Sequence, residues 1–307
     1  MKAVIHKSTG SWYTAKIPGK GLVQCRIKGI FKIDDISSTN PIAVGDEVDL
    51  QEENEIEATY LINEIYERKN YVARQSPHNK KQHHIIAANL DQSVLFATLI
   101  EPKTSQGFID RFLTSCESFH IPAIIVFNKS DLYRKKEQQI FEEWEAMYSA
   151  IGYKVLAISL KEKQNLDEFT ALLKDKTSLL SGHSGVGKST FINHIVPGIE
   201  LRTTEVSGWS GKGMHTTTFA EMHDLPFGGS IIDTPGMREF GLVHISKNEL
   251  SHYFPEMLQA LHNCKFNNCM HVNEPGCGIK AAVAANKIHI KRYESYLNIL
   301  GSIEEGW

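Results

Sequence analysis

The sequence predicts three domains: a small β-barrel, a central α/β domain with a parallel sheet, and a compact helical C-terminal domain that binds a metal ion. At 307 residues the chain exceeds the roughly 100–200 residues of one ordinary domain. Its apolar pattern changes near Asp91 from short alternating runs to continuous runs, and three of its five cysteines lie between residues 264 and 277. The expected domains are 1–66, 67–245 and 246–307.

The N-terminal region is predicted to be the barrel. Short alternating runs at 12–17 and 22–27 are separated by turn sequences that contain Gly and Pro, which is typical of short strands in a small barrel. Residues 66–90 are polar and are expected to form a linker with a mobile centre rich in His and Lys. Cys25 and Cys116 lie alone in apolar surroundings, so we expect buried thiols there.

The central region is predicted to be a parallel sheet covered by helices on both faces. Continuous Val, Ile and Leu runs alternate there with helical stretches at 107–120, 134–150 and 165–175, which is typical of such sheets. Ligands of these folds bind at the carboxyl ends of the strands. The expected strands lie within DQSVLFATLI, PAIIVFN, YKVLAIS, KTSLLSG and SIIDTPG.

The sequence GHSGVGKST at 182–190 has the strand, loop and helix context of a phosphate-binding loop. Gly182 and Gly187 would let backbone N–H groups face a β-phosphate. Lys188, a candidate catalytic residue, would neutralise β and γ charge, and the Ser189 hydroxyl would complete a Mg²⁺ shell. The residues expected to bind nucleotide here are Gly182, His183, Ser184, Gly185, Val186, Gly187, Lys188, Ser189 and Thr190.

A second motif, NKSD at 128–131, directly follows the apolar run PAIIVF. Asp131 can accept hydrogen bonds from the ring N–H and the exocyclic amine of guanine, a pair of donors that adenine lacks. Lys129 would lie along the base, and Asn128 would connect this loop to the phosphate loop. Ser159 and Leu160 begin a Ser-Leu-Lys sequence where GTPases usually carry Ser-Ala-Lys. Together with the phosphate loop, these residues predict GTP rather than ATP as the nucleotide.

Two further segments are predicted to be nucleotide switches. In DTPG at 233–236, Asp233 would hold Mg²⁺ through water, and the backbone N–H of Gly236, a candidate catalytic group, would sense the γ-phosphate. In SGWSGKGMHTTT, Thr216 or Thr217 would give a second hydroxyl to Mg²⁺, with Thr217 preferred. A Gly- and Ser-rich loop that is ordered only by metal and γ-phosphate is typical of a switch.

His215 is the candidate catalytic residue of the first switch. Ras-like enzymes orient the attacking water with a Gln just after Asp-x-x-Gly, but this sequence has Met237 there. A thioether does not hold a water as an amide does, so His215 is the nearest replacement. The alternative is that His215 only packs against or caps the loop.

The order of these motifs predicts a circular permutation. The base-reading motifs at 128 and 159 precede the phosphate loop at 182 and the switches at 216 and 233, whereas ordinary GTPases have the phosphate loop first. Such a rearrangement is tolerated because the termini of domains usually lie close together at the surface. Because the second switch runs straight into the C-terminal domain, we expect a nucleotide-driven change to move that domain.

The C-terminal domain is predicted to be built around zinc. Cys264, Cys269, His271 and Cys277 provide three thiolates and one imidazole within fourteen residues, a ligand set suited to structural zinc. His262 is a possible substitute ligand, and unligated core cysteines are the alternative. A capping box of Ser246 and Glu249 is expected to open one helix. Its shared apolar face would comprise Leu250, Tyr253, Phe254 and Met257.

Charge and composition suggest a soluble protein that contacts a polyanion. The net charge is only −3, but residues 1–33, 68–90 and 278–293 are basic and contain no Asp or Glu, which favours a polyanion-binding surface; solvated Lys faces are the alternative. A helix over 278–293 would present Lys280, Lys287, Lys291 and Arg292 to the phosphates of such a polyanion. Trp12, Tyr13 and Phe31 lie among basic residues, as on a nucleic-acid-binding face, unless they fill the barrel.

Membrane insertion and secretion are not expected. No window approaches the roughly 18 uncharged apolar residues of a membrane span. The N-terminal MKAVIHKSTG turns polar within six residues, which leaves no room for the apolar core of a signal peptide. We therefore expect a cytoplasmic protein.

The permuted order, GHSGVGKS, GMHTTT, DTPGMREFGL and CKFNNCMHVNEPGCGIK together resemble the RsgA (YjeQ or YloQ) family of circularly permuted GTPases. The resemblance spans nearly the whole chain. It implies an N-terminal OB-fold, a permuted GTPase, a zinc-binding helical tail, and binding to the 30S ribosomal subunit late in its assembly. We further expect GTP hydrolysis with Mg²⁺, contact with 16S rRNA, and a monomer. One alternative is an RNA-binding assembly factor with GTP as a structural ligand, and another is a P-loop kinase.

Overall fold

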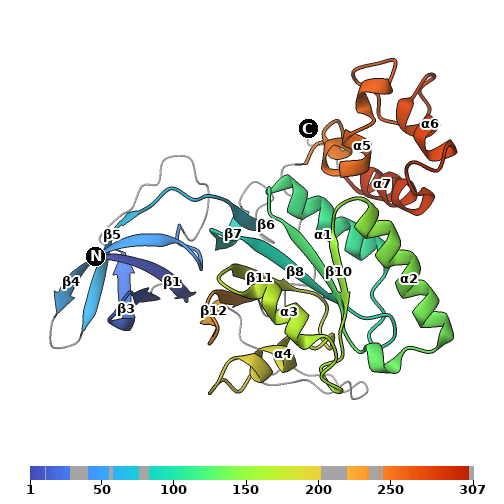
Figure 1. The fold of residues 1–307 in the computed structure, drawn as a ribbon. Helices are drawn as coiled ribbons and strands as arrows, with labels where there is room; N and C mark the ends of the chain where they lie inside the picture. The colour runs from blue at the N-terminus through green and yellow to red at the C-terminus, as the bar shows by residue number, and fades with distance from the viewer. Residues whose placement is uncertain are drawn as a thin grey trace, which may run out of the picture.

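The computed structural model contains a barrel, a central sheet flanked by helices, and a helical C-terminal domain (Figure 1). It describes residues 1–10, 12–27, 41–54, 58–75, 83–201, 220–234, 242 and 245–303. An eleven-stranded sheet, in the order β10-β9-β8-β11-β13-β12-β1-β2-β3-β5-β4, runs through the barrel and the central domain. No helix of the described residues is long and apolar enough to span a membrane.

The N-terminal strands close into a five-stranded barrel, as the sequence predicts. These are β1 (Lys2–Ser8), β2 (Tyr13–Ile17), β3 (Gly21–Ile27), β4 (Glu47–Asn54) and β5 (Thr59–Ile65). The sheet closes because β1 pairs with both β2 and β4, while β3 pairs with β5 in the parallel direction. This order is that of an OB-type barrel. Buried residues of alternating strand positions fill it, including the thiol-bearing Cys25.

Two segments of the predicted polar linker form strands, which were not predicted from the sequence. Strands β6 (Tyr71–Gln75) and β7 (His83–Ala88) form an antiparallel ladder. Val72 and Ala87 are buried in the core of the central domain, so packing against that core outweighs the polar composition. Residues 76–82, in the predicted mobile centre, lie outside the described part of the chain.

A buried ion pair joins the barrel to these strands. The Arg68 guanidinium donates to both carboxylate oxygens of Asp46, at 2.6 and 2.7 Å, and also to the carbonyl of Pro41. Asp46 is fully buried, and its carboxylate also accepts from the backbone N–H of Ala43. Gly45 lies so close to the carbonyl of Ala88 that a Cβ would come within 2.1 Å of its oxygen. The ion pair and the close approach of Gly45 to Ala88 therefore restrict how the barrel is oriented relative to β6 and β7.

The central sheet agrees with the predicted apolar runs. Its parallel strands are β8 (Gln92–Ala97), β9 (Ala123–Phe127), β10 (Lys154–Ala157), β11 (Thr177–Ser181) and β13 (Ser230–Asp233). β12 (Glu221–Asp224) runs antiparallel beside β13 and pairs on its other side with β1 of the barrel. At that junction Lys7 contacts Glu221 at 2.9 Å and Lys16 contacts Asp224 at 2.7 Å.

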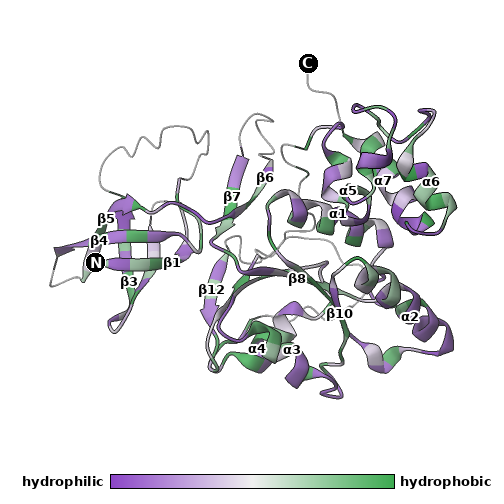
Figure 2. Ribbon diagram, turned by 45° about the horizontal axis from the view of Figure 1, so that its top comes forward, coloured by the Kyte–Doolittle hydropathy of each residue, from purple (hydrophilic) through white to green (hydrophobic). Residues whose placement is uncertain are grey.

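Helices cover both faces of this sheet, as predicted. One face packs against α1 (Gln106–Ser118) and α2 (Lys135–Ala150), and the other against α3 (Leu166–Leu173) and α4 (Lys188–Ile195). Cys116 is buried in the first of these cores. The outer side of α2 is largely hydrophilic (Figure 2), as expected of a helix with one face in water.

The C-terminal domain differs from its predicted helices. The capping contacts between Ser246 and Glu249 are present, but they open the 3₁₀ turn η2 (Leu250–Tyr253), and α5 (Pro255–Leu258) follows as a separate helix. Proline at 255 disfavours helical backbone at Phe254, so the single predicted helix was wrong.

The predicted helix over 278–293 is divided in the same way. It consists of α6 (Gly278–Ala284) and the start of α7 (Ile290–Ser302). Asn286 between them has a positive φ of 55°, which no right-handed helix accommodates. A further 3₁₀ turn, η3 (Leu261–Asn263), precedes the cysteine-rich loop.

Replacing Arg68 by Ala should destabilise the protein by about 3–5 kcal/mol, because it leaves the fully buried Asp46 carboxylate without its partner. The neighbouring Lys69→Ala is a matched control. Lys69 pairs with Asp91 where both side chains are well exposed, so its loss should cost no more than about 1 kcal/mol. Urea denaturation checks both values, and equal effects of the two substitutions would contradict the role given to the buried pair.

Candidate nucleotide site and cysteine cluster

The phosphate loop lies between β11 and α4 and requires glycine at two positions. Gly182 has φ 134°, and a Cβ there would lie 2.2 Å from the carbonyl oxygen of Phe96. Gly187 has φ 105°, and a Cβ there would lie 2.3 Å from the amide nitrogen of Asn128. These two glycines therefore let the loop approach β8 on one side and the NKSD loop on the other.

Lys188 and Asp233 form the charged centre of this region. The Lys188 ammonium donates to the carbonyls of Gly182 at 2.6 Å and His183 at 3.0 Å. Burial lowers the pKa of Lys188, and the nearby Asp233 carboxylate partly offsets this. Burial raises the pKa of Asp233, with Lys188 acting in the opposite direction. A bound cation would favour the charged carboxylate.

These residues fit a Mg²⁺ ion with a phosphate ligand. Asp233, at the end of β13, is a buried carboxylate whose burial makes its charge costly without a cation. Ser189, in the first turn of α4, carries the hydroxyl expected to be the second oxygen ligand. Carboxylate, hydroxyl and phosphate oxygens are the ligands that Mg²⁺ prefers.

Asn128 joins the NKSD loop to the phosphate loop. Its side chain is buried, and the amide nitrogen donates to the carbonyl of Val186 at 2.8 Å. Its amide oxygen accepts from the backbone N–H of Leu160 at 3.3 Å. One side chain thus connects the ends of three strands, β9, β10 and β11.

The remaining candidate base-reading residues lie beside Asn128. The Ser159 hydroxyl donates to one carboxylate oxygen of Asp131 at 2.6 Å and accepts from the backbone N–H of Glu162 at 3.0 Å. This fixes the direction of the Asp131 carboxylate. Lys129 has a left-handed backbone, with φ 65°, and its ammonium donates to the carbonyl of Glu101.

The structure leaves the switch residues undescribed. His215, Thr216, Thr217 and Gly236 lie outside the described residues, so their predicted roles stay predictions. Of the DTPG motif, Asp233 and Thr234 are described and buried.

The expectation that Arg292 contacts a polyanion was wrong, and the two alternatives for the aromatic residues of the barrel are now distinguished for Tyr13 and Trp12. Arg292 is only 1% exposed and is enclosed by the carboxylates of Asp110 and Glu256. Tyr13 is buried in the barrel core, so for this residue the barrel-filling alternative holds, whereas Trp12 is exposed with the Arg26 guanidinium over its ring. Phe31 lies outside the described residues.

The other basic residues of the predicted helix differ in their contacts. Lys291 pairs with Glu143 of α2 at 2.5 Å, and Lys280 donates to the carbonyl of Val272. Lys287 is exposed. The C-terminal basic segment therefore presents fewer free cations than the sequence suggests.

The four predicted metal ligands come together. The ligand atoms of Cys264, Cys269, His271 and Cys277 all lie within 4.8 Å of one another. Nδ1 of His271 is 3.6 Å from the sulfur of Cys264 and 3.5 Å from that of Cys277. Three sulfurs and one nitrogen at this spacing fit a tetrahedral metal ion. His262 is not part of the cluster in the described residues.

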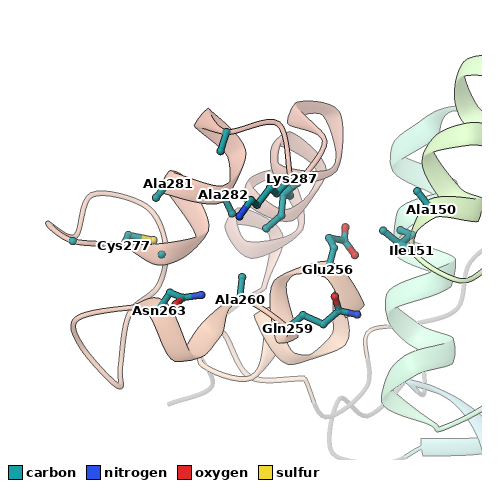
Figure 3. A pocket seen from close by; sticks show the side chains of 14 residues that line it. Ala150, Ile151, Glu256, Gln259, Ala260, Asn263, Cys277, Ala281, Ala282 and Lys287 are labelled. Carbon is teal, nitrogen blue, oxygen red and sulfur yellow. The ribbon is translucent and has the colours of Figure 1, made fainter.

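Two tyrosines of helix α7 donate hydrogen bonds to the loop that carries the metal ligands. The Tyr293 hydroxyl donates to the carbonyl of His271 at 2.6 Å, and the Tyr296 hydroxyl donates to the carbonyl of Met270 at 2.9 Å. A cavity of about 680 Å³ lies on another side, between the end of α2 at Ala150 and Ile151 and the small residues of the C-terminal domain (Figure 3). Cys277 lines this cavity.

The chain matches known proteins along its whole length. Residues 65–243 match the RsgA GTPase family model and residues 2–60 match the RsgA N-terminal domain. It is 47% identical over 306 residues to the small ribosomal subunit biogenesis GTPase RsgA of Bacteroides fragilis, covering 100% of this chain and 98% of the relative. The corresponding protein of Flavobacterium johnsoniae is 48% identical over 308 residues, covering 99% and 94%.

Two solved structures are also similar. YjeQ from Thermotoga maritima has a TM-score of 0.79 and 32% identity, covering 98% of this chain and 97% of that one. YloQ, described as a circularly permuted GTPase, has a TM-score of 0.76 and 28% identity, covering 100% and 96%.

Proposed function

The chain belongs to the RsgA GTPase family, and from this premise we propose that it binds the small ribosomal subunit and hydrolyses GTP during late maturation of that subunit. The observation that carries the nucleotide assignment is the hydrogen bond from Asn128 to Val186, which holds the guanine-reading and phosphate loops together. The names of the relatives supply the ribosomal subunit. We further propose the domain limits 1–66, 67–245 and 246–307.

In this proposal each loop has one task. Asp131, whose carboxylate accepts a hydrogen bond from Ser159, reads the guanine edge. Lys129 lies along the base, and Leu160 contacts the base through its backbone N–H. The loop from Gly182 to Thr190 holds the phosphates, and Lys188 leaves its loop carbonyls to neutralise their charge. Ser189, Thr217 (or Thr216) and Asp233 would hold Mg²⁺, which would neutralise charge on the β- and γ-phosphates.

We assign hydrolysis to residues of the two predicted switch segments. The Gly236 N–H would sense the γ-phosphate, and His215 would position the attacking water in place of the missing Gln. His215 could reach the γ-phosphate only when its loop is ordered, and we propose that contact with 16S rRNA through the two flanking domains orders it. The protein would act as a cytoplasmic monomer.

The cysteine cluster is proposed to hold one structural zinc ion. Its four protein ligands leave no open position for a substrate. The domain is small, and zinc binding typically contributes on the order of 10 kcal/mol to the folding of such a unit. Its task would be to keep the C-terminal domain folded against α1 and α2.

The first prediction concerns the base. Asp131→Asn should weaken GTP binding about tenfold or more, because an amide N–H₂ facing a guanine N–H leaves buried donors unpaired at about 1–3 kcal/mol each. Xanthine nucleotides should regain some affinity. The exposed Asp167→Asn on α3 is the control and should bind GTP normally. Titration with a fluorescent nucleotide checks this, and unchanged GTP affinity in Asp131→Asn would remove Asp131 from the site.

The second prediction concerns the metal. Purified protein should contain about one zinc per chain, and Cys269→Ala should lose the zinc and the ordered C-terminal domain because one of the four ligands is gone. Cys25→Ala, in the barrel core, should keep its zinc. Elemental analysis and near-UV circular dichroism measure both effects; a folded C-terminal domain without any metal would contradict the ligand assignment.

The third prediction tests the proposed function as a whole. GTP turnover should be slow in the isolated protein and at least about a hundredfold faster with purified 30S subunits, since assembling a catalytic group is worth several kcal/mol. His215→Ala should lose most of that stimulation. Turnover that 30S subunits do not change would instead favour an RNA-binding factor with GTP as a structural ligand, and full stimulation in His215→Ala would remove His215 from catalysis.

A further inference from the structure

An aromatic stack connects α1 to the phosphate loop. The rings of Phe108, in the first turn of α1, and His183 lie 3.9 Å apart between centroids, with 29° between their planes. His183 is the second residue of the phosphate loop, and its carbonyl accepts a hydrogen bond from the Lys188 ammonium. The position of the His183 ring is therefore linked to the backbone that Lys188 contacts.

The same end of α1 is anchored from the C-terminal domain. Two residues beyond Phe108, the fully buried Asp110 accepts from a terminal nitrogen of Arg292 at 2.6 Å and from the Tyr148 hydroxyl at 2.8 Å. Arg292 lies on α7 and also donates to both carboxylate oxygens of Glu256, at 2.7 and 3.3 Å. Its guanidinium lies 4.6 Å from the ring centroid of Phe254.

This ion cluster holds α1 in one position. Burial alone would lower the pKa of Arg292, but Asp110 and Glu256 raise it above its ordinary value, so the guanidinium stays charged. Moving α1 away would leave a buried charge without its partner, which is costly. The cavity beside Glu256 separates the end of α2 from the C-terminal domain (Figure 3). The ion cluster is therefore the closely packed part of the contact between α1 and the C-terminal domain.

We propose that Phe108 is a positioning residue for the nucleotide: it fixes His183 and the phosphate loop, and Arg292 fixes Phe108 through Asp110. The C-terminal domain thereby acts on the phosphate loop through one turn of α1. This inference rests on the nucleotide-binding function proposed above and extends it to a residue that lies in no nucleotide motif. The two sites influence each other reciprocally, as any coupled pair must.

A double-mutant cycle tests the stack. Phe108→Ala and His183→Ala should each weaken GDP and GTP binding about three- to tenfold, the range expected for one aromatic pair. Because both remove the same contact, the double variant should be no weaker than the worse single variant. Phe108→Tyr keeps an aromatic ring at this position and should bind nucleotide with wild-type affinity. Phe119→Ala is the matched control, because Phe119 follows α1 and its ring lies tilted against that of Tyr71, 5.6 Å between centroids.

A second arm tests the anchor. Arg292→Lys keeps the buried charge but cannot contact both carboxylates as the guanidinium does, so it should also weaken nucleotide binding, and adding it to Phe108→Ala should have no further effect. Fluorescent-nucleotide titration gives the affinities, and thermal unfolding reports stability separately. Phe119→Ala should lower the melting temperature without changing nucleotide affinity.

The outcomes separate this inference from the proposed function. Fully additive losses in the double variant, or wild-type affinity in Phe108→Ala, would overturn the positioning role while wild-type GTP binding stands. Failure of the wild-type protein to bind GTP would overturn the proposed function itself. Equal losses of affinity in Phe119→Ala and Phe108→Ala would mean that both act through general stability, and this would also overturn the positioning role.

Discussion

The hydrogen bond between the Asn128 amide and the Val186 carbonyl is the contact on which the nucleotide site depends. It joins residues 58 positions apart, and it is possible only because Gly187 has no side chain to occupy the space of that amide. β9 and β11 deliver the two loops to the same edge of the sheet, with β8 between them. The permuted chain order is compatible with this contact because strand position, not sequence order, decides which loops meet.

Two joints connect this site to the flanking domains. On one side β1 of the barrel pairs with β12, whose Glu221 lies opposite both Lys7 and the magnesium-site candidate Asp233. On the other side Arg292 binds Asp110. Each joint contains a charge pair, which is partly exposed between Lys7 and Glu221 and buried between Arg292 and Asp110. Under the proposed function, these joints would link nucleotide state to binding by the flanking domains.

Local patterns made the barrel, the central sheet and the candidate loops predictable from the sequence. Apolar runs of strand length can be recognised from consecutive residues of the chain. The same holds for the motifs that contain Gly187, Asn128 and the four metal ligands. The β6–β7 ladder and the burial of Tyr13 and Arg292 depend on partners that are distant in sequence. The helix break at Pro255 has a local cause, the effect of proline on the backbone of Phe254. Phe108 belongs to no motif, and only the folded position of α1 brings it to His183.

The most direct test of the account is the affinity of the protein for purified 30S subunits in two nucleotide states. A non-hydrolysable GTP analogue and GDP, each at saturating concentration and constant salt, should give dissociation constants that differ by about tenfold or more, with tighter binding in the GTP-like state. That difference corresponds to a coupling free energy of about 1.4 kcal/mol between nucleotide and subunit. Equal dissociation constants in the two states would contradict the claim that nucleotide state controls binding to the subunit.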